Sequence, residues 1–137
     1  IADVKTHFNI DPRRVILGGY SSGGDLAYRT AFYQANLFAG VLAENTSPFR
    51  DTGSSPAASL AASAWKFNVV HLAHTGDDVY PIAGVRNETD AMAAAGFPIT
   101  RIEKPGNHWD NDAGATGTNY DLQTFLLPRL SDGWLAP

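Results

Sequence analysis

One short stretch, residues 13–27, restricts the fold more than any other part of the chain. It joins an apolar run at 15–17 to a turn rich in glycine and serine, and a helical pattern follows. The apolar run is typical of a buried strand. The turn contains the spacing Gly19-x-Ser21-x-Gly23, so that a serine stands between the strand and the helix. This order predicts a strand that leads directly into a helix, as in layered α/β folds.

The pattern around Ser21 predicts a nucleophile elbow, in which a serine is held on a sharp strand-to-helix turn. Such a serine has a strained backbone, and we expect that Gly19 and Gly23 must both lack a Cβ to avoid a collision. The Ser22 N–H at the helix N-terminus would face an oxyanion formed beside the serine. Ser22 is not the nucleophile of this pattern, because Tyr20 stands where its first glycine would be. A plain glycine-rich turn is the alternative.

Apolar runs and helical patterns alternate along the rest of the chain. This alternation predicts an α/β fold with about four parallel strands and helices on both faces of the sheet. Residues 46–66, rich in proline, serine and glycine, are interpreted as a cap or binding excursion, or else as a surface connection. The predicted strands are at about 14–19, 38–44, 67–72 and 98–103. The first predicted helix ends near residue 9, and the later ones lie at about 22–35, 57–64, 82–95 and 119–128.

Three chemically active side chains each come just after a predicted strand: Ser21, Asp77 and His108. Ligands of parallel sheets bind beyond the C-terminal ends of the strands, so these side chains are expected at one edge. A serine needs an adjacent base, and the base needs a third group to orient it. The order serine, acid, histidine is the one that this type of fold uses. Asp78 adjoins Asp77 and could take its place.

The other histidines and the acidic loop after His108 have less specific patterns. His7 lies on the first predicted helix, and His71 and His74 are expected in core or supporting roles on the third strand. The spacing Asp110-x-Asp112 resembles part of a calcium loop, but the later positions lack the ligand and the glycine that such a loop needs. We interpret it as a solvated acidic loop, and expect neither a metal ion nor a cofactor.

Composition narrows the class of protein further. The chain has 137 residues, about the length of one domain, and a net charge of −4. It has no cysteine, which excludes disulfides, thiolate metal sites and a cysteine nucleophile but leaves the compartment open. Without a basic patch interleaved with aromatic residues, a nucleic-acid partner is not expected. No apolar run approaches membrane-spanning length and no signal peptide is visible, so no membrane association is expected.

With these turns the sequence resembles the α/β-hydrolase superfamily. More narrowly, it resembles the secreted bacterial esterases grouped with polyhydroxybutyrate depolymerases and feruloyl esterases. The resemblance implies a carboxylic ester hydrolase that works through an acyl-enzyme at a Ser–His–Asp triad of Ser21, His108 and Asp77. It favours Asp77 over Asp78, because the acid of related sequences stands four residues before a proline, here Pro81. It also implies an extracellular location. The matching stretches are residues 9–15, 19–24, 74–81 and 105–108.

The resemblance covers only the second half of a complete member of the superfamily. Residues 1–137 are therefore predicted to be the C-terminal part of a single α/β-hydrolase domain. Ile1, Val4 and Phe8 have the spacing of a helix already under way. In a complete member an earlier loop supplies the second oxyanion N–H. We expect that this N-terminal half exists, in the same chain or in a separate chain from the same precursor, and that it pairs with the first strand.

Two further functions and two roles for the aromatic residues stay open at this point. The chain could be a catalytically silent module that binds or assembles, or a peptidase or amidase that uses the same residues. Tyr20, Tyr80 and Trp109 could line an aromatic pocket for a feruloyl or polyester substrate. They could equally pack against the core beneath the sheet edge.

Overall fold

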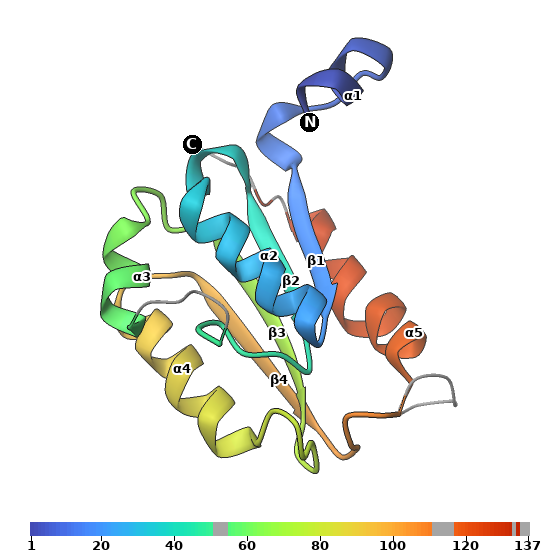
Figure 1. The fold of residues 1–137 in the computed structure, drawn as a ribbon. Coiled ribbons are helices and arrows are strands. Elements are labelled where there is room, and N and C mark those ends of the chain that lie inside the picture. The colour runs from blue at the N-terminus through green and yellow to red at the C-terminus, as the bar shows by residue number, and fades with distance from the viewer. Residues whose placement is uncertain (51–54, 111–116, 133, 135–137) are drawn as a thin grey trace.

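Four parallel strands form the centre of the fold (Figure 1). The computed structural model describes residues 1–50, 55–110, 117–132 and 134. Consecutive strands are neighbours in the sheet, and each is paired in parallel with the next. The predicted α/β class with about four parallel strands is confirmed. The strands are β1 (Ile16–Tyr20), β2 (Gly40–Glu44), β3 (Asn68–His74) and β4 (Ile99–Lys104).

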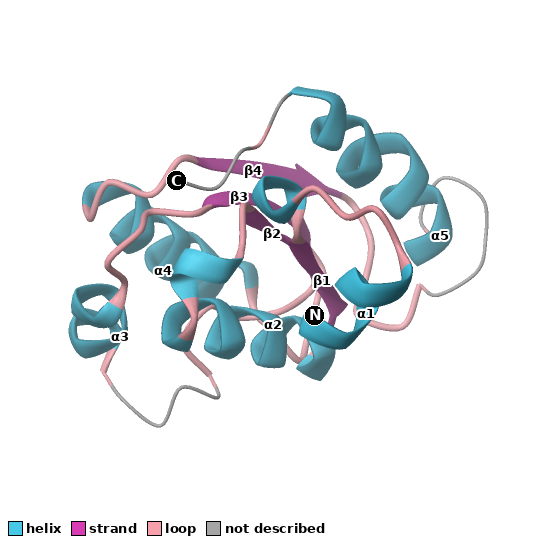
Figure 2. Cartoon of the chain, turned by 90° about the horizontal axis from the view of Figure 1, so that it is seen from above, coloured by secondary structure: helices cyan, strands magenta, loops and turns pink. Residues whose placement is uncertain are grey.

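Helices cover both faces of the sheet, as the alternation predicts (Figure 2). On one face lie α2 (Ser22–Tyr33), α3 (Pro56–Ala62) and α4 (Ile82–Ala94). On the other face α5 (Thr118–Asp121) continues into the π-helical turn η4 (Leu122–Leu126) and the 3₁₀ segment η5 (Leu127–Asp132). The last segment contains Pro128, which has no N–H for an α-helical bond. None of the described helices is both long and apolar enough to cross a membrane.

The core has two layers because alternate strand residues point to opposite faces of the sheet. On β3, Val69 packs in the cluster beneath α2 and α4, whereas Val70 and Leu72 pack with Leu126 on the other face. All five residues of β2 are buried, as expected for a parallel strand covered on both sides. Apolar packing on both faces therefore holds the sheet in place. It also fixes the positions at which the loops leave the C-terminal ends of the strands.

The segment before β1 extends away from the body of the fold (Figure 1). It consists of α1 (Ala2–His7), which has no buried residue, and the short 3₁₀ turn η1 (Pro12–Arg14); a similar turn, η2 (Ala35–Leu37), follows α2. Phe8 is 66% exposed. Within the described part of the chain β1 pairs only with β2, so the opposite edge of β1 has no strand partner there.

Candidate active site

Ser21 stands on the sharp turn between β1 and α2. Its φ of +54° and ψ of −131° lie outside the regions that residues with a side chain usually adopt. The Ser21 N–H donates to the carbonyl of Glu44 at 3.0 Å, which ties the turn to the end of β2. Ser22 is the first residue of α2, so its N–H has no acceptor within the helix. The turn has the strain and the free amide that an elbow requires.

The close approach at this turn involves Gly19 and not Gly23. A Cβ on Gly19 would lie 2.3 Å from the carbonyl oxygen of Gly23, whereas a Cβ on Gly23 would meet no heavy atom within 4 Å. The expectation that both glycines are required is therefore wrong for Gly23. The reason is directional: the missing Cβ of Gly19 points at the Gly23 backbone, and that of Gly23 points into open space. A second tight position is Gly24, whose Cβ would lie 2.6 Å from the Thr46 side chain.

This difference predicts a large loss of stability for one alanine substitution and a small change for the other. Gly19→Ala places a methyl group against backbone and is expected to lower the free energy of unfolding by roughly 1–3 kcal/mol or more. Gly23→Ala is expected to change it by less than about 1 kcal/mol, because alanine is accepted in a helix more readily than glycine. Urea denaturation of both variants measures the two values. Equal losses of stability would contradict the assignment.

Three predicted site residues form one hydrogen-bonded series. His108 Nε2 lies 2.9 Å from Ser21 Oγ, and His108 Nδ1 lies 2.8 Å from an Asp77 carboxylate oxygen. His108 is 2% and Asp77 5% exposed, while Ser21 is half-buried. These residues come from the ends of three different strands, and the sheet brings them to the same edge. The arrangement can pass a proton from a serine hydroxyl to an imidazole that a carboxylate orients.

The turn after β3 selects which of two adjacent carboxylates faces the imidazole. Asp77 Oδ1 accepts hydrogen bonds from the N–H groups of Val79 and Tyr80, both at 2.8 Å, and this leaves Oδ2 for His108. Asp78, in contrast, is exposed to solvent. Asp77 is therefore the carboxylate in position to orient His108.

His74 supports the loop that carries His108. Its ring is fully buried, with Nδ1 2.9 Å from the carbonyl oxygen of Asn107 and Nε2 2.9 Å from Asp121. The ring thus connects the residue before His108 to α5. Gly106 passes directly over this ring: a Cβ there would lie 2.9 Å from it. His74 therefore has one of the two roles expected from the sequence, that of a residue that supports the site.

His71 belongs to the core instead. Its Nδ1 lies 2.8 Å from the Tyr28 hydroxyl, and burial lowers the pKa of His71 to about 3. The imidazole is therefore neutral at physiological pH. His7 lies on α1, which has no buried residue.

One cluster of ligand-type side chains lies beside this edge. Atoms of Glu44, His74 and Asp121 lie within 4.8 Å of one another. The Lys104 ammonium, however, forms an ion pair with Asp121 and already supplies positive charge there. This donor set fits a buried ion-pair network better than a metal centre. In the acidic loop, Asp110 accepts from the N–H of Asn107; Asp112 lies outside the described residues.

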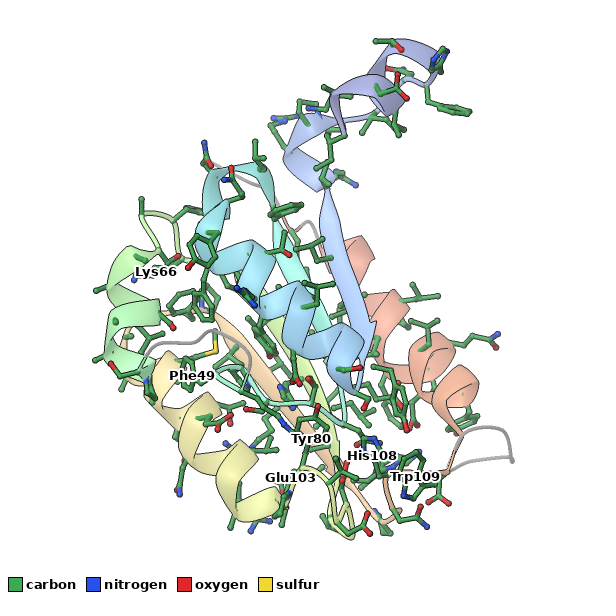
Figure 3. All side chains as sticks on the ribbon, in the orientation of Figure 1. Phe49, Lys66, Tyr80, Glu103, His108 and Trp109 are labelled. Atoms are coloured by element: carbon green, nitrogen blue, oxygen red, sulfur yellow. The ribbon has the colours of Figure 1, made fainter. Side chains whose placement is uncertain are left out.

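Two tyrosines pack against the His108 ring, as Figure 3 shows for Tyr80. The ring centroids of Tyr20 and Tyr80 lie 5.2 Å and 5.5 Å from that of His108, with interplanar angles of 25° and 31°. The Tyr20 hydroxyl also donates to the His108 carbonyl oxygen. The Trp109 and His108 rings form a T-shaped pair with an interplanar angle of 84°, and Trp109 is 66% exposed. The two tyrosines therefore pack around the imidazole, and Trp109 lies at the surface.

Asp25 is a site residue that the sequence patterns did not indicate. It lies four residues after Ser21 on α2, is 2% exposed, and accepts a hydrogen bond from the Tyr80 hydroxyl at 2.6 Å. The available signal was its helical spacing to Tyr28 and Phe32, which places a carboxylate on the buried face of that helix.

A cavity of about 400 Å³ adjoins the site on the side of Tyr80. It lies between the segment after β2 and the start of α4, and its size is within the range of small-molecule pockets. Excursion residues including Phe49 and Arg50 supply one wall, and the Arg50 guanidinium lies 4.5 Å from the centre of the Tyr80 ring. Glu88 lines another wall, where burial raises its pKa.

The architecture matches solved structures with the α/β-hydrolase fold. The chain resembles esterase PE8 with a TM-score of 0.72 and 21% identity over 94% of this chain and 56% of that one. It resembles an acylaminoacyl peptidase of Pyrococcus horikoshii with a TM-score of 0.73 and 15% identity over 98% of this chain and 26% of that one. A ferulic acid esterase matches with a TM-score of 0.56 and 16% identity over 79% and 51%.

These likenesses define the class of fold: the chain has the α/β-hydrolase fold, and it spans about half the length of esterase PE8. No family model matches the sequence, and no curated protein matches it significantly.

Proposed function

We propose that this protein is a serine hydrolase that cleaves carboxylic esters through an acyl-enzyme. The observation that carries the proposal is the continuous series Ser21–His108–Asp77, with contacts of 2.9 Å and 2.8 Å at the C-terminal edge of the sheet. The fold and its esterase neighbours support it.

In the proposed reaction Ser21 Oγ attacks the ester carbonyl carbon while its proton passes to His108 Nε2. The carbonyl π-bond opens, and the resulting oxyanion is stabilised by the Ser22 N–H. Asp77 stabilises the imidazolium through Nδ1. The C–O bond to the alcohol then breaks, and the alcohol leaves with the proton from His108. Water repeats the sequence on the acyl-enzyme and releases the acid and free Ser21.

Esters are proposed over amides because two of the similar structures, esterase PE8 and a ferulic acid esterase, are ester hydrolases by name. The peptidase alternative rests on the likeness to the Pyrococcus horikoshii enzyme. The test compares a short-chain aryl ester with the matched anilide. We expect a burst of one equivalent of phenol and a clear preference for the ester. Preference for the anilide would support the peptidase, and a folded protein with neither activity would support the silent binding module.

We also propose that a further segment, from the same or a separate chain, pairs with β1 and supplies a second oxyanion N–H. Among the described residues one edge of β1 has no strand partner, and Val4 and Phe8 are exposed; both support this proposal, because such an edge and such apolar side chains are usually covered. Loss of one oxyanion donor costs roughly 10²–10³ in rate. We therefore expect residues 1–137 alone to be slower than the full gene product by that factor, and equal rates would contradict the proposal.

The cavity beside Tyr80 is proposed to receive the acyl group. Gly84 lines it, and a Cβ there would meet no atom within 4 Å, so Gly84→Leu fills the cavity without disturbing α4. We expect the rate with octanoyl esters to fall roughly tenfold relative to acetyl esters. Ala83→Leu, one residue earlier and exposed, is the control. An unchanged ratio of the two rates in Gly84→Leu would contradict the proposal that this cavity receives the acyl group.

A further inference from the structure

Tyr80 contacts Asp77 and His108 of the proposed triad, and through Asp25 it is joined to the helix that begins after Ser21. Its backbone N–H donates to Asp77 at 2.8 Å, and its ring lies against the His108 ring (Figure 3). Burial, followed by the Asp25 carboxylate, raises the pKa of Tyr80 to about 12. The phenol is therefore neutral at physiological pH, and its hydroxyl donates to the Asp25 carboxylate.

Asp25 fixes the position of this hydroxyl. One carboxylate oxygen accepts from the Tyr80 hydroxyl at 2.6 Å. The other accepts from Thr46 Oγ1 at 2.5 Å and from the Ser47 N–H at 3.1 Å. Three hydrogen bonds compensate for the burial of this carboxylate. The group thus connects the helix that begins at the nucleophile to the loop after β2 and to the turn that carries Asp77.

We propose that Tyr80, held by Asp25, is a positioning residue that sets the distance between the nucleophile and the histidine–acid pair. The inference rests on the proposed hydrolase function. Ser21 and Asp77 belong to segments that follow different strands, and neither turn by itself sets the distance between them. The hydrogen bond from Tyr80 to Asp25 joins the turn of Asp77 to the helix that begins after Ser21. A misplacement of about 1 Å in such a site can cost roughly 10²-fold in rate.

The chain offers a matched control for this role. Tyr28 is also buried, its hydroxyl lies 2.8 Å from His71 Nδ1, and its ring lies 5.9 Å from the His71 ring. Like Tyr80 it packs its ring against a histidine, but its hydroxyl bonds that histidine and not a carboxylate. Tyr28→Phe therefore removes a comparable buried hydrogen bond without touching the triad.

The experiment measures kcat, KM and the rate of labelling by a fluorophosphonate probe in the full natural chain. An aryl acetate is the substrate, because its acyl group is too small to depend on the cavity. We expect Tyr80→Phe to lower kcat roughly tenfold and Tyr80→Val roughly 100-fold, with KM within about twofold and with labelling slowed in parallel. Tyr28→Phe is expected to lower the unfolding midpoint and leave kcat unchanged.

Two results would overturn the inference. One is a kcat within twofold of wild type in folded Tyr80→Phe and Tyr80→Val. The other is an equal loss of kcat in Tyr28→Phe and Tyr80→Phe, which would indicate a general effect of stability. If Tyr80→Val fails to fold, Tyr80→Phe decides, since it keeps the ring and the backbone N–H. A wild-type protein that neither labels nor turns over would instead contradict the proposed function.

Discussion

Substitution of Ser21 by alanine is expected to lower kcat for aryl ester hydrolysis by roughly 10⁴- to 10⁶-fold. The change removes the only atom that bonds covalently to the acyl group in the proposed reaction, and leaves only substrate binding and oxyanion stabilisation. Alanine keeps the Cβ, so the backbone strain at φ +54° is the same as with serine and folding should not be impaired. Initial rates and fluorophosphonate labelling measure the effect.

Ser22→Ala is the matched control for this prediction. Ser22 is proposed to act through its backbone N–H, which alanine keeps, and its side chain is exposed. We expect this variant to retain its rate within a few-fold and to label normally. Labelling that persists in Ser21→Ala and disappears in Ser22→Ala would move the nucleophile by one residue and disprove the elbow as described.

Asp77→Asn has the second largest expected effect, a loss in kcat of roughly 10⁴-fold. Asparagine can still accept the Val79 and Tyr80 N–H bonds, so the turn should persist. Its amide would donate to His108 Nδ1 and favour the tautomer with a proton on Nε2. That nitrogen could then no longer accept the proton of Ser21.

Asp78→Asn carries the same chemical change on the neighbouring, exposed residue. We expect kcat/KM within about twofold of wild type, because this carboxylate does not face the imidazole. Measurement of kcat/KM for both variants on one ester decides between them. A large loss in Asp78→Asn together with a small one in Asp77→Asn would reverse the assignment of the acid.

Much of the fold could be predicted because its signals are local. Burial on both faces gives β2 and β3 their continuous apolar runs, and proline and glycine mark where elements end. Gly96, just beyond the end of α4, has a φ of +92°, which glycine adopts readily. The ends of elements were less predictable: β3 continues to His74, two residues past the expected end, because its pairing with β4 continues to Lys104.

By itself, the sequence determined the order of strands and helices and placed Ser21, Asp77 and His108 each just after a strand. Only the tertiary structure decided that Asp77 and not Asp78 faces the imidazole, that Gly19 and not Gly23 must lack a Cβ, and that Tyr80 reaches Asp25. The physical reason is the range of the interactions. Burial periodicity and turn chemistry depend on neighbouring residues, whereas the contacts of Asp77 with His108 and of Tyr80 with Asp25 join residues 31 and 55 apart, whose distance is set by the packing of the whole sheet. The approach of Gly19 to Gly23 is local, but it depends on the direction of the missing Cβ, which only the backbone conformation of the turn shows.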